Sequence, residues 1–403
     1  MVGRALVLRT TFVAGIGAVL AKVLISCVDL ESLGNGPPDG AAPPAEASVP
    51  DVVDPCTHDQ PAATSSLNDG DGELPTFVLA LNTITFDPKK VVPLDLDGVC
   101  TCDPRPGTAR EGGPACASPE PNCDADGGGD NSLGLVANES APIVGVETVV
   151  NRVIAAGHRT LLLQIEKYNG LANDKEVVVG TLLAEGIRSQ GCPSSVLEAA
   201  KPLWSTGGCG NDPWTVSPAS VLFVTGSGLL PLARGIGYVR DFQLIVRIKD
   251  TALFPFNDES TFRVAMPIVQ ARLVPLDENL APRDPARPPA TEREKRLFRI
   301  DEGVIAGRVL TTDVLGILGA YQPSTGPRLC AQDAKFGLVR ERICRGADIP
   351  AQGTAPFDPS KACDALSGAL GFAAIPAVTA PVADAAVPNT GCESVDAAAF
   401  RCP

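Results

Sequence analysis

The chain has 403 residues and a formal net charge of −14 at neutral pH, with 44% hydrophobic and only 4% aromatic residues. This length is sufficient to bury one large hydrophobic core or two modest ones. The acidic balance excludes two classes of charge-driven partner, nucleic acids and anionic membrane surfaces, because both are bound through basic patches.

Residues 1–26 have the composition of an export signal. Arg4 and Arg9 precede an uncharged run from residue 10 to residue 21, which is the pattern of a basic region followed by a short apolar region. A membrane-spanning helix needs about 20 apolar residues, and Arg9 and Lys22 bracket the run too closely for that. We therefore expect a signal peptide at 1–26.

The signal ends in Leu24-Ile25-Ser26-Cys27, which resembles the lipobox of bacterial lipoproteins. The resemblance covers residues 1–27. In that family the chain is cut before the cysteine, which is then acylated, so the resemblance implies that Cys27 carries the lipid that attaches the protein to a membrane. By the same analogy, Val28 in place of an aspartate favours the outer membrane. An ordinary secreted protein is the alternative.

Residues 27–73 are expected to form an acidic tether. Residues 28–88 contain eleven acidic residues and no lysine or arginine. The stretch is rich in proline, glycine and alanine, and such a composition cannot bury enough apolar surface to fold alone. We expect a flexible, self-repelling stalk between the anchor and a folded body.

Two aspartate-rich stretches, DLDGVCTC and CDADGGGDN, follow the tether. If the two cysteines of the first stretch pair with Cys116 and Cys123, the stretches are drawn together, and their oxygens suit calcium, which takes about 6–8 oxygen ligands. The candidate ligands are Asp95, Asp97, Asp124, Asp126, Asp130 and Asn131. The alternative is that these residues simply form tight turns. The C-x-C and C-x6-C spacings depart from zinc-site spacing and favour disulfides.

From residue 74 onward the chain is predicted to consist of short strands separated by turns, and residues 74–320 are expected to form the folded body. Runs rich in β-branched and aromatic residues, or alternating with a period of two, predict strands at 76–86, 160–168, 176–183, 242–249, 261–274 and 296–310, with shorter pieces in VLFV and ALGFAAI. Helical spacing and capping residues predict helices at 146–157, 311–320 and 333–344. We expect a mainly β fold, a β-sandwich or jelly roll with a few short helices.

The C-terminal segment, 321–403, is expected to be cysteine-rich, helical or irregular, and packed on that body. The chain has 13 cysteines, so twelve remain for disulfides if Cys27 carries lipid. Cysteines in disulfides are typical of exported proteins. Cys330 and Cys344 bracket the last predicted helix, and Cys192 and Cys209 bracket a tryptophan-containing loop, so these are the two candidate pairs.

Sequence signals for catalysis are weak. The chain has two histidines, His58 in the tether and His158 at a predicted helix end, and it has no G-x-S-x-G, P-loop or H-E-x-x-H motif. A glycosidase needs only two carboxylates. Trp204 and Trp214, in the polar stretch WSTGGCGNDPW, are candidates for stacking on a sugar. Their alternative role is to fill the underside of a disulfide loop.

A second resemblance concerns the body. The set DLDGVCTC, CDADGGGDN, YNG..ND, GVIAGR..TTD and CDALSGALGF is similar to that of uncharacterised predicted lipoproteins from gliding soil bacteria. It spans most of residues 76–376 and implies no activity and no site residue.

Together these observations predict an exported, lipid-anchored, disulfide-stapled protein facing the surface or the periplasm. We expect it to bind an extracellular or periplasmic ligand or partner without catalysis, with a structural calcium ion. The alternative is a carbohydrate-active enzyme on a jelly-roll scaffold, because sandwiches host both functions.

Overall fold

The structure is a computed structural model that describes residues 72–98, 101, 116–118, 123–124, 128–187, 212–225, 228–322, 328–330, 334–352, 360–384 and 400–402. Several predictions lie outside these residues: the signal peptide, Cys27, nearly all of the tether, Asp126, Trp204 and the Cys192–Cys209 pair.

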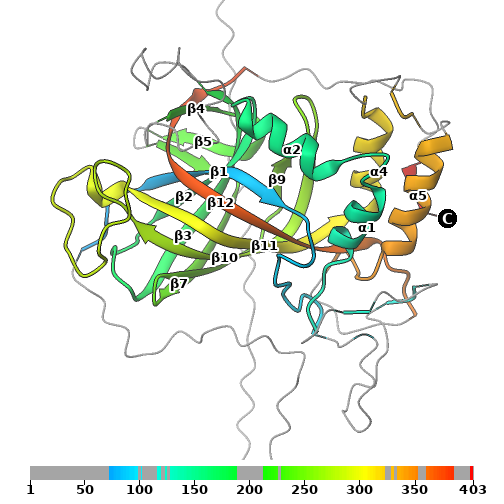
Figure 1. Ribbon diagram of the computed structural model, residues 1–403, viewed down its shortest axis with the longest axis horizontal. Helices are drawn as coiled ribbons and strands as arrows, with labels where there is room; N and C mark the ends of the chain where they lie inside the picture. Colours follow the sequence, from blue (N-terminus) through cyan, green and yellow to red (C-terminus); the bar gives the residue numbers. More distant parts are fainter. Residues whose placement is uncertain are drawn as a thin grey trace, which may run out of the picture. The chain divides into compact units, whose positions relative to one another are not determined.

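The body is mainly β, and its central sheet is a closed barrel of eight antiparallel strands (Figure 1). The strands follow one another round the barrel in chain order: β1 (Phe77–Thr85), β2 (Thr160–Glu166), β3 (Asp174–Ile187), β7 (Ala233–Arg240), β8 (Gln243–Ile248), β10 (Thr261–Pro275), β11 (Phe298–Leu310) and β12 (Ala365–Val382). Antiparallel pairing of β1 with β12, from Val78 opposite Ala377 to Thr85 opposite Gly371, closes the ring.

The predicted β-sandwich is therefore wrong, although the mainly β class is confirmed. Sandwich and barrel strands share the same alternation of inward and outward side chains. What separates the two folds is the pairing of the first strand with the last. The C-terminal segment supplies that last strand, since β12 pairs with both β11 and β1, so residues from both 74–320 and 321–403 form the barrel sheet.

The remaining elements cover the barrel. The accessory strands are β4 (Asp212–Val216), β5 (Val221–Thr225), β6 (Gly228–Pro231) and β9 (Ala252–Pro255). The helices are α1 (Ser132–Ser140), α2 (Val146–Ala155), α4 (Thr311–Ala320) and α5 (Ala334–Gly346), with short 3-10 turns η2 (Pro218–Ser220) and η3 (Glu294–Arg296). No helix among the described residues is both long and apolar enough to cross a membrane.

Large apolar side chains fill the barrel interior. Cross-strand pairs place Leu79 beside Leu163, and Val246 beside Val269, on the inner face, and all four are buried in one hydrophobic cluster. Burying a leucine or valine side chain stabilises the fold by about 1.5–3 kcal/mol. The described strands thus enclose a packed core, which carries most of the folding energy.

Helix α2 completes the outer side of β1. Asn151 accepts a hydrogen bond from the Ile84 amide at 2.8 Å and donates one to the Ile84 carbonyl at 2.8 Å. One turn earlier, Glu147 accepts from the Phe86 amide at 2.8 Å. Because β2 pairs with β1 only over Phe77–Ala80, these two side chains satisfy strand groups that lack a neighbouring strand there.

Helices α1, α4 and α5 stand together at one end of the barrel (Figure 1). Their buried side chains include Leu315, Phe336 and Ile343, and they share the main core. A disulfide joins Cys344 of α5 to Cys402. The predicted Cys330–Cys344 pair is therefore wrong. Cys330 is disulfide-bonded, but the partner of Cys344 comes from the C-terminal tail. The spacing of cysteines along a predicted helix could not reveal where that tail lies.

Candidate cation site

The site lies beside the first half of β12, where one edge of this strand has no strand neighbour, because β1 pairs with β12 only from Gly371 onward. Side chains satisfy that edge instead. Asn131 accepts from the Ala369 amide at 3.0 Å, and Asp348 accepts from the Ser367 amide at 2.7 Å and the Ser367 hydroxyl at 2.5 Å. These contacts fix the start of α1 and the segment after α5 against the barrel.

A loop after β1 brings further carboxylates to the same place. Val91 and Leu94 pack in a small hydrophobic cluster against outward-facing side chains of β10, β11 and β12. Gly129 permits close contact with this loop, because a Cβ there would lie 2.5 Å from Cγ of Pro93. The loop therefore passes next to residues 128–131, just before α1.

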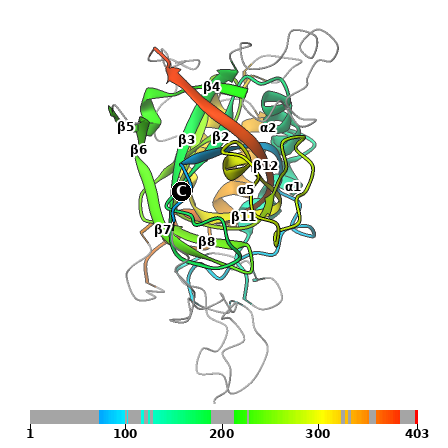
Figure 2. The same ribbon diagram turned by 90° about the vertical axis from the view of Figure 1, so that its left-hand side faces the viewer.

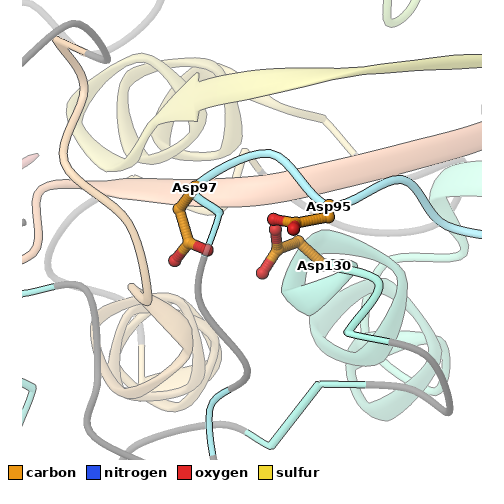
Figure 3. Close-up of side chains that lie close together, drawn as sticks. All are labelled: Asp95, Asp97 and Asp130. Atoms are coloured by element: carbon orange, nitrogen blue, oxygen red, sulfur yellow. The ribbon is translucent and has the colours of Figure 1, made fainter. Parts of the chain in front are cut away.

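Asp95, Asp97 and Asp130 form the centre of the site (Figure 3). One carboxylate oxygen from each lies within 4.8 Å of the others. Asp130 is 2% exposed, and its Oδ2 accepts a hydrogen bond from the Leu96 amide at 2.6 Å. Asp95 accepts from the Gly98 amide at 2.6 Å. Three carboxylates at this spacing could bind a metal ion.

Arg308 is a positively charged side chain next to these three carboxylates. It lies on β11 and is 7% exposed. Its guanidinium donates to the carbonyl oxygens of Leu96 at 2.6 Å and Pro350 at 2.7 Å. Since its hydrogen bonds go to neutral carbonyls, Arg308 orders the loop and compensates the carboxylates only through space.

The electrostatics of the cluster favour protonation in the absence of a cation. Burial, and then the neighbouring Asp97 and Asp124 carboxylates, raise the pKa of Asp130 to about 10. Burial also raises the pKa of Asp124 to about 7, although the Thr101 amide, 2.5 Å from its Oδ2, opposes this. Burial raises the pKa of Asp348 to about 6 against its hydrogen bonds from Ser367. Like charges and low solvation act together here.

The candidate ligands thus separate into three groups. Asp95, Asp97 and Asp130 come together as expected. Asp124 lies near enough to affect their charge but falls outside that trio. Asn131 caps α1, and its carbonyl oxygen accepts from the Gly134 and Ala369 amides, which occupies both of its lone pairs and makes it a structural residue.

The structure tests one half of the hypothesis that cysteines of the first stretch pair with Cys116 and Cys123. Cys116 pairs with Cys363, 247 positions away, so the expected bond from Cys116 to the first stretch is wrong. Cys123 is disulfide-bonded as well. The bonds confirm disulfides for these cysteines and indicate an extracytoplasmic protein.

Two members of the site have no motif signal. Asp348 follows α5 in RGADIP, and Arg308 interrupts the apolar run GVIAGRVL. A lone arginine in an otherwise apolar strand is a usable hint, because a buried guanidinium requires polar neighbours. The identity of those neighbours depends on the fold.

The candidate sugar-stacking residue in the described region is buried. Trp214 lies in β4 with an exposure of 0%, where the strand pairs with β12 and β3. Its side chain is part of the main hydrophobic core and offers no face to a sugar, so that prediction is wrong for Trp214.

Comparison with known proteins gave no match: the sequence matches no family model, no curated protein and no solved structure.

Proposed function

We propose that this chain is an exported, lipid-anchored binding module, stapled by disulfides and carrying a structural calcium ion at Asp95, Asp97 and Asp130. It binds an extracellular or periplasmic ligand and catalyses no reaction. The observed disulfides support export. The anchor rests on the lipobox resemblance at Cys27.

The observation that carries the calcium proposal is the environment of Asp130. This carboxylate is almost fully buried, it has a single side-chain hydrogen bond, from the Leu96 amide, and no ion pair joins it to another described residue. A buried carboxylate in that state either takes up a proton or binds a cation. Two further carboxylates within 4.8 Å favour the cation, and hard oxygen ligands favour calcium.

The calcium proposal is tested by thermal unfolding and titration calorimetry with and without calcium. We expect calcium to raise the melting temperature, since a ligand at about 100 times its Kd stabilises a protein by about 2.7 kcal/mol. Asp97→Asn should abolish the response and raise the stability of the calcium-free protein, because it removes one of the repelling charges. Asp250→Asn, at an exposed position, is the matched control and should keep the response. A wild-type protein indifferent to saturating calcium would refute the site.

The anchor is tested separately by mass spectrometry of protein extracted from membranes. A mass equal to a chain that begins at acylated Cys27 is expected, and Cys27→Ala should leave the protein out of the membrane fraction. An unmodified wild-type chain in the soluble fraction would show that the protein is secreted without an anchor.

A further inference from the structure

A long loop stands at the end of the barrel opposite α1, α4 and α5 (Figures 1 and 2). It connects β10 to β11 over residues 276–297. Its base is closed by a hydrogen bond from the Leu276 amide to the Leu297 carbonyl at 2.9 Å and by a bridge between Leu276 and Pro282. Within this loop is a pocket of about 580 Å³, a size typical of small-molecule sites.

Arg283 lines this pocket, and its buried guanidinium has no carboxylate partner among the described residues. It is 6% exposed. Its Nη1 makes one long hydrogen bond, 3.4 Å, to the Asp284 carbonyl, and its Nε has no hydrogen-bond partner among the described residues. No ion pair joins it to another described residue. Burying a charge without an oppositely charged partner is costly. The buried guanidinium of Arg283 therefore points to an anionic group that binds in the pocket.

The other buried charge in the loop is already satisfied. Glu294 is 4% exposed, and its carboxylate accepts from Arg287 at 3.2 and 3.3 Å and from the Ala290 amide at 2.7 Å. Glu294 and Asp284 support the charge of Arg283 through space, but no carboxylate of a described residue forms a hydrogen bond or an ion pair with its guanidinium. Arg283 is therefore the one buried group of the pocket that could pair directly with a ligand carboxylate.

The rim of the pocket is acidic. Asp277 accepts from the Asn279 amide at 2.9 Å and the Ala281 amide at 3.0 Å, and Glu278 accepts from the Thr291 hydroxyl at 2.6 Å. With Asp284 these groups place negative charge around the buried Arg283. A dianion would be repelled, whereas a ligand with one carboxylate and one cationic group would meet complementary charges at both of its ends.

We propose that this pocket binds a small zwitterion, such as an amino acid or a short peptide. The ligand's carboxylate pairs with Arg283, and its ammonium group faces the acidic rim. This assignment rests on the proposed role of the chain as a binding module, and it is independent of the calcium site, whose residues come from other segments.

The test is titration calorimetry of the full-length protein, with calcium present, against three probes: L-alanyl-L-alanine, acetate and ethylamine. We expect the dipeptide to bind most tightly, acetate weakly and ethylamine not at all. Arg283→Met should weaken dipeptide binding by roughly ten- to a hundredfold, the usual effect of losing a charged hydrogen bond. Arg296→Met, an exposed arginine in the same loop, should leave it unchanged.

Asp284→Asn should change dipeptide and acetate binding in opposite directions, a result that misfolding of the loop would not produce. It should weaken dipeptide binding and strengthen acetate binding, because it removes a negative charge from the rim. Equal binding of acetate and dipeptide, or dipeptide binding that survives Arg283→Met, would overturn the assignment. If no probe binds while calcium still stabilises the protein, the pocket assignment fails and the calcium proposal stands.

Discussion

A single arginine in the barrel wall, Arg308, has two roles at the cation site, one through its hydrogen bonds and one through its charge. Its hydrogen bonds hold the Leu96 and Pro350 carbonyls, and its charge faces Asp97, Asp130 and Asp348, which in turn support its ionised form. The burial that lowers the pKa of Arg308 is thus partly offset by these carboxylates. Loop position and charge balance therefore depend on one side chain.

We expect Arg308→Met to lower the free energy of unfolding by about 3–5 kcal/mol, because removing one member of a buried charged group leaves the others uncompensated. Urea denaturation measures this. Arg345→Met is the control, since Arg345 is exposed and pairs with the exposed Glu139 at 3.8 Å, and such pairs contribute about 0–1 kcal/mol. Equal losses in the two variants would show that Arg308 has no special electrostatic role.

Among the secondary-structure elements, those with strong periodicity were predictable and those defined by distant partners were not. The strands at 76–86 and 261–274 and the helix at 311–320 match β1, β10 and α4 within two residues. In contrast α1, in SLGLVANES, has no clear apolar stripe, and it is fixed by its Asn131 cap and by contacts with β12. Local sequence carries no record of such contacts.

The junction of α2 with β1 yields a prediction at this scale. We expect Asn151→Ala to lower the free energy of unfolding by roughly 2 kcal/mol, since it leaves the amide and carbonyl of Ile84 without side-chain partners. Hydrogen exchange at the Ile84 amide should accelerate. Asn138→Ala, at an exposed position on α1, serves as the control and should change stability by only a few tenths of a kcal/mol. Unchanged exchange at Ile84 would contradict the proposed role of this contact.

For the whole molecule, closure explains both the wrong fold prediction and the partly correct site. The aspartate content of the two loops indicated oxygen ligands, and Asp95, Asp97 and Asp130 do meet. Their meeting depends on β12, however, which comes from the far end of the chain and whose free edge holds Asn131 and Asp348. The periodicity and spacing of a single sequence give no pairing between residues so far apart.

The charge of the site also makes the stability of the protein depend on pH, and calcium should act on this dependence in the opposite direction. The folded pKa values of about 7 for Asp124, about 6 for Asp348 and about 10 for Asp130 exceed the ordinary 3.8. At pH values between the ordinary pKa of 3.8 and the raised folded pKa values, the calcium-free folded protein binds more protons than the unfolded chain. Its stability should therefore fall as pH rises through this window. The facing groups are Asp95, Asp97 and the guanidinium of Arg308.

Calcium requires the ionised carboxylates, so its binding releases protons and its stabilising effect should increase with pH. Melting temperatures measured from about pH 4 to about pH 9, in chelator and in calcium, should converge in acid and diverge in base. Asp124→Asn should flatten the chelator curve between about pH 4 and about pH 7, while Asp250→Asn should not alter it. Parallel curves would show that no cation is bound by these carboxylates. A chelator curve that rises with pH would instead show that the folded protein keeps them ionised without one.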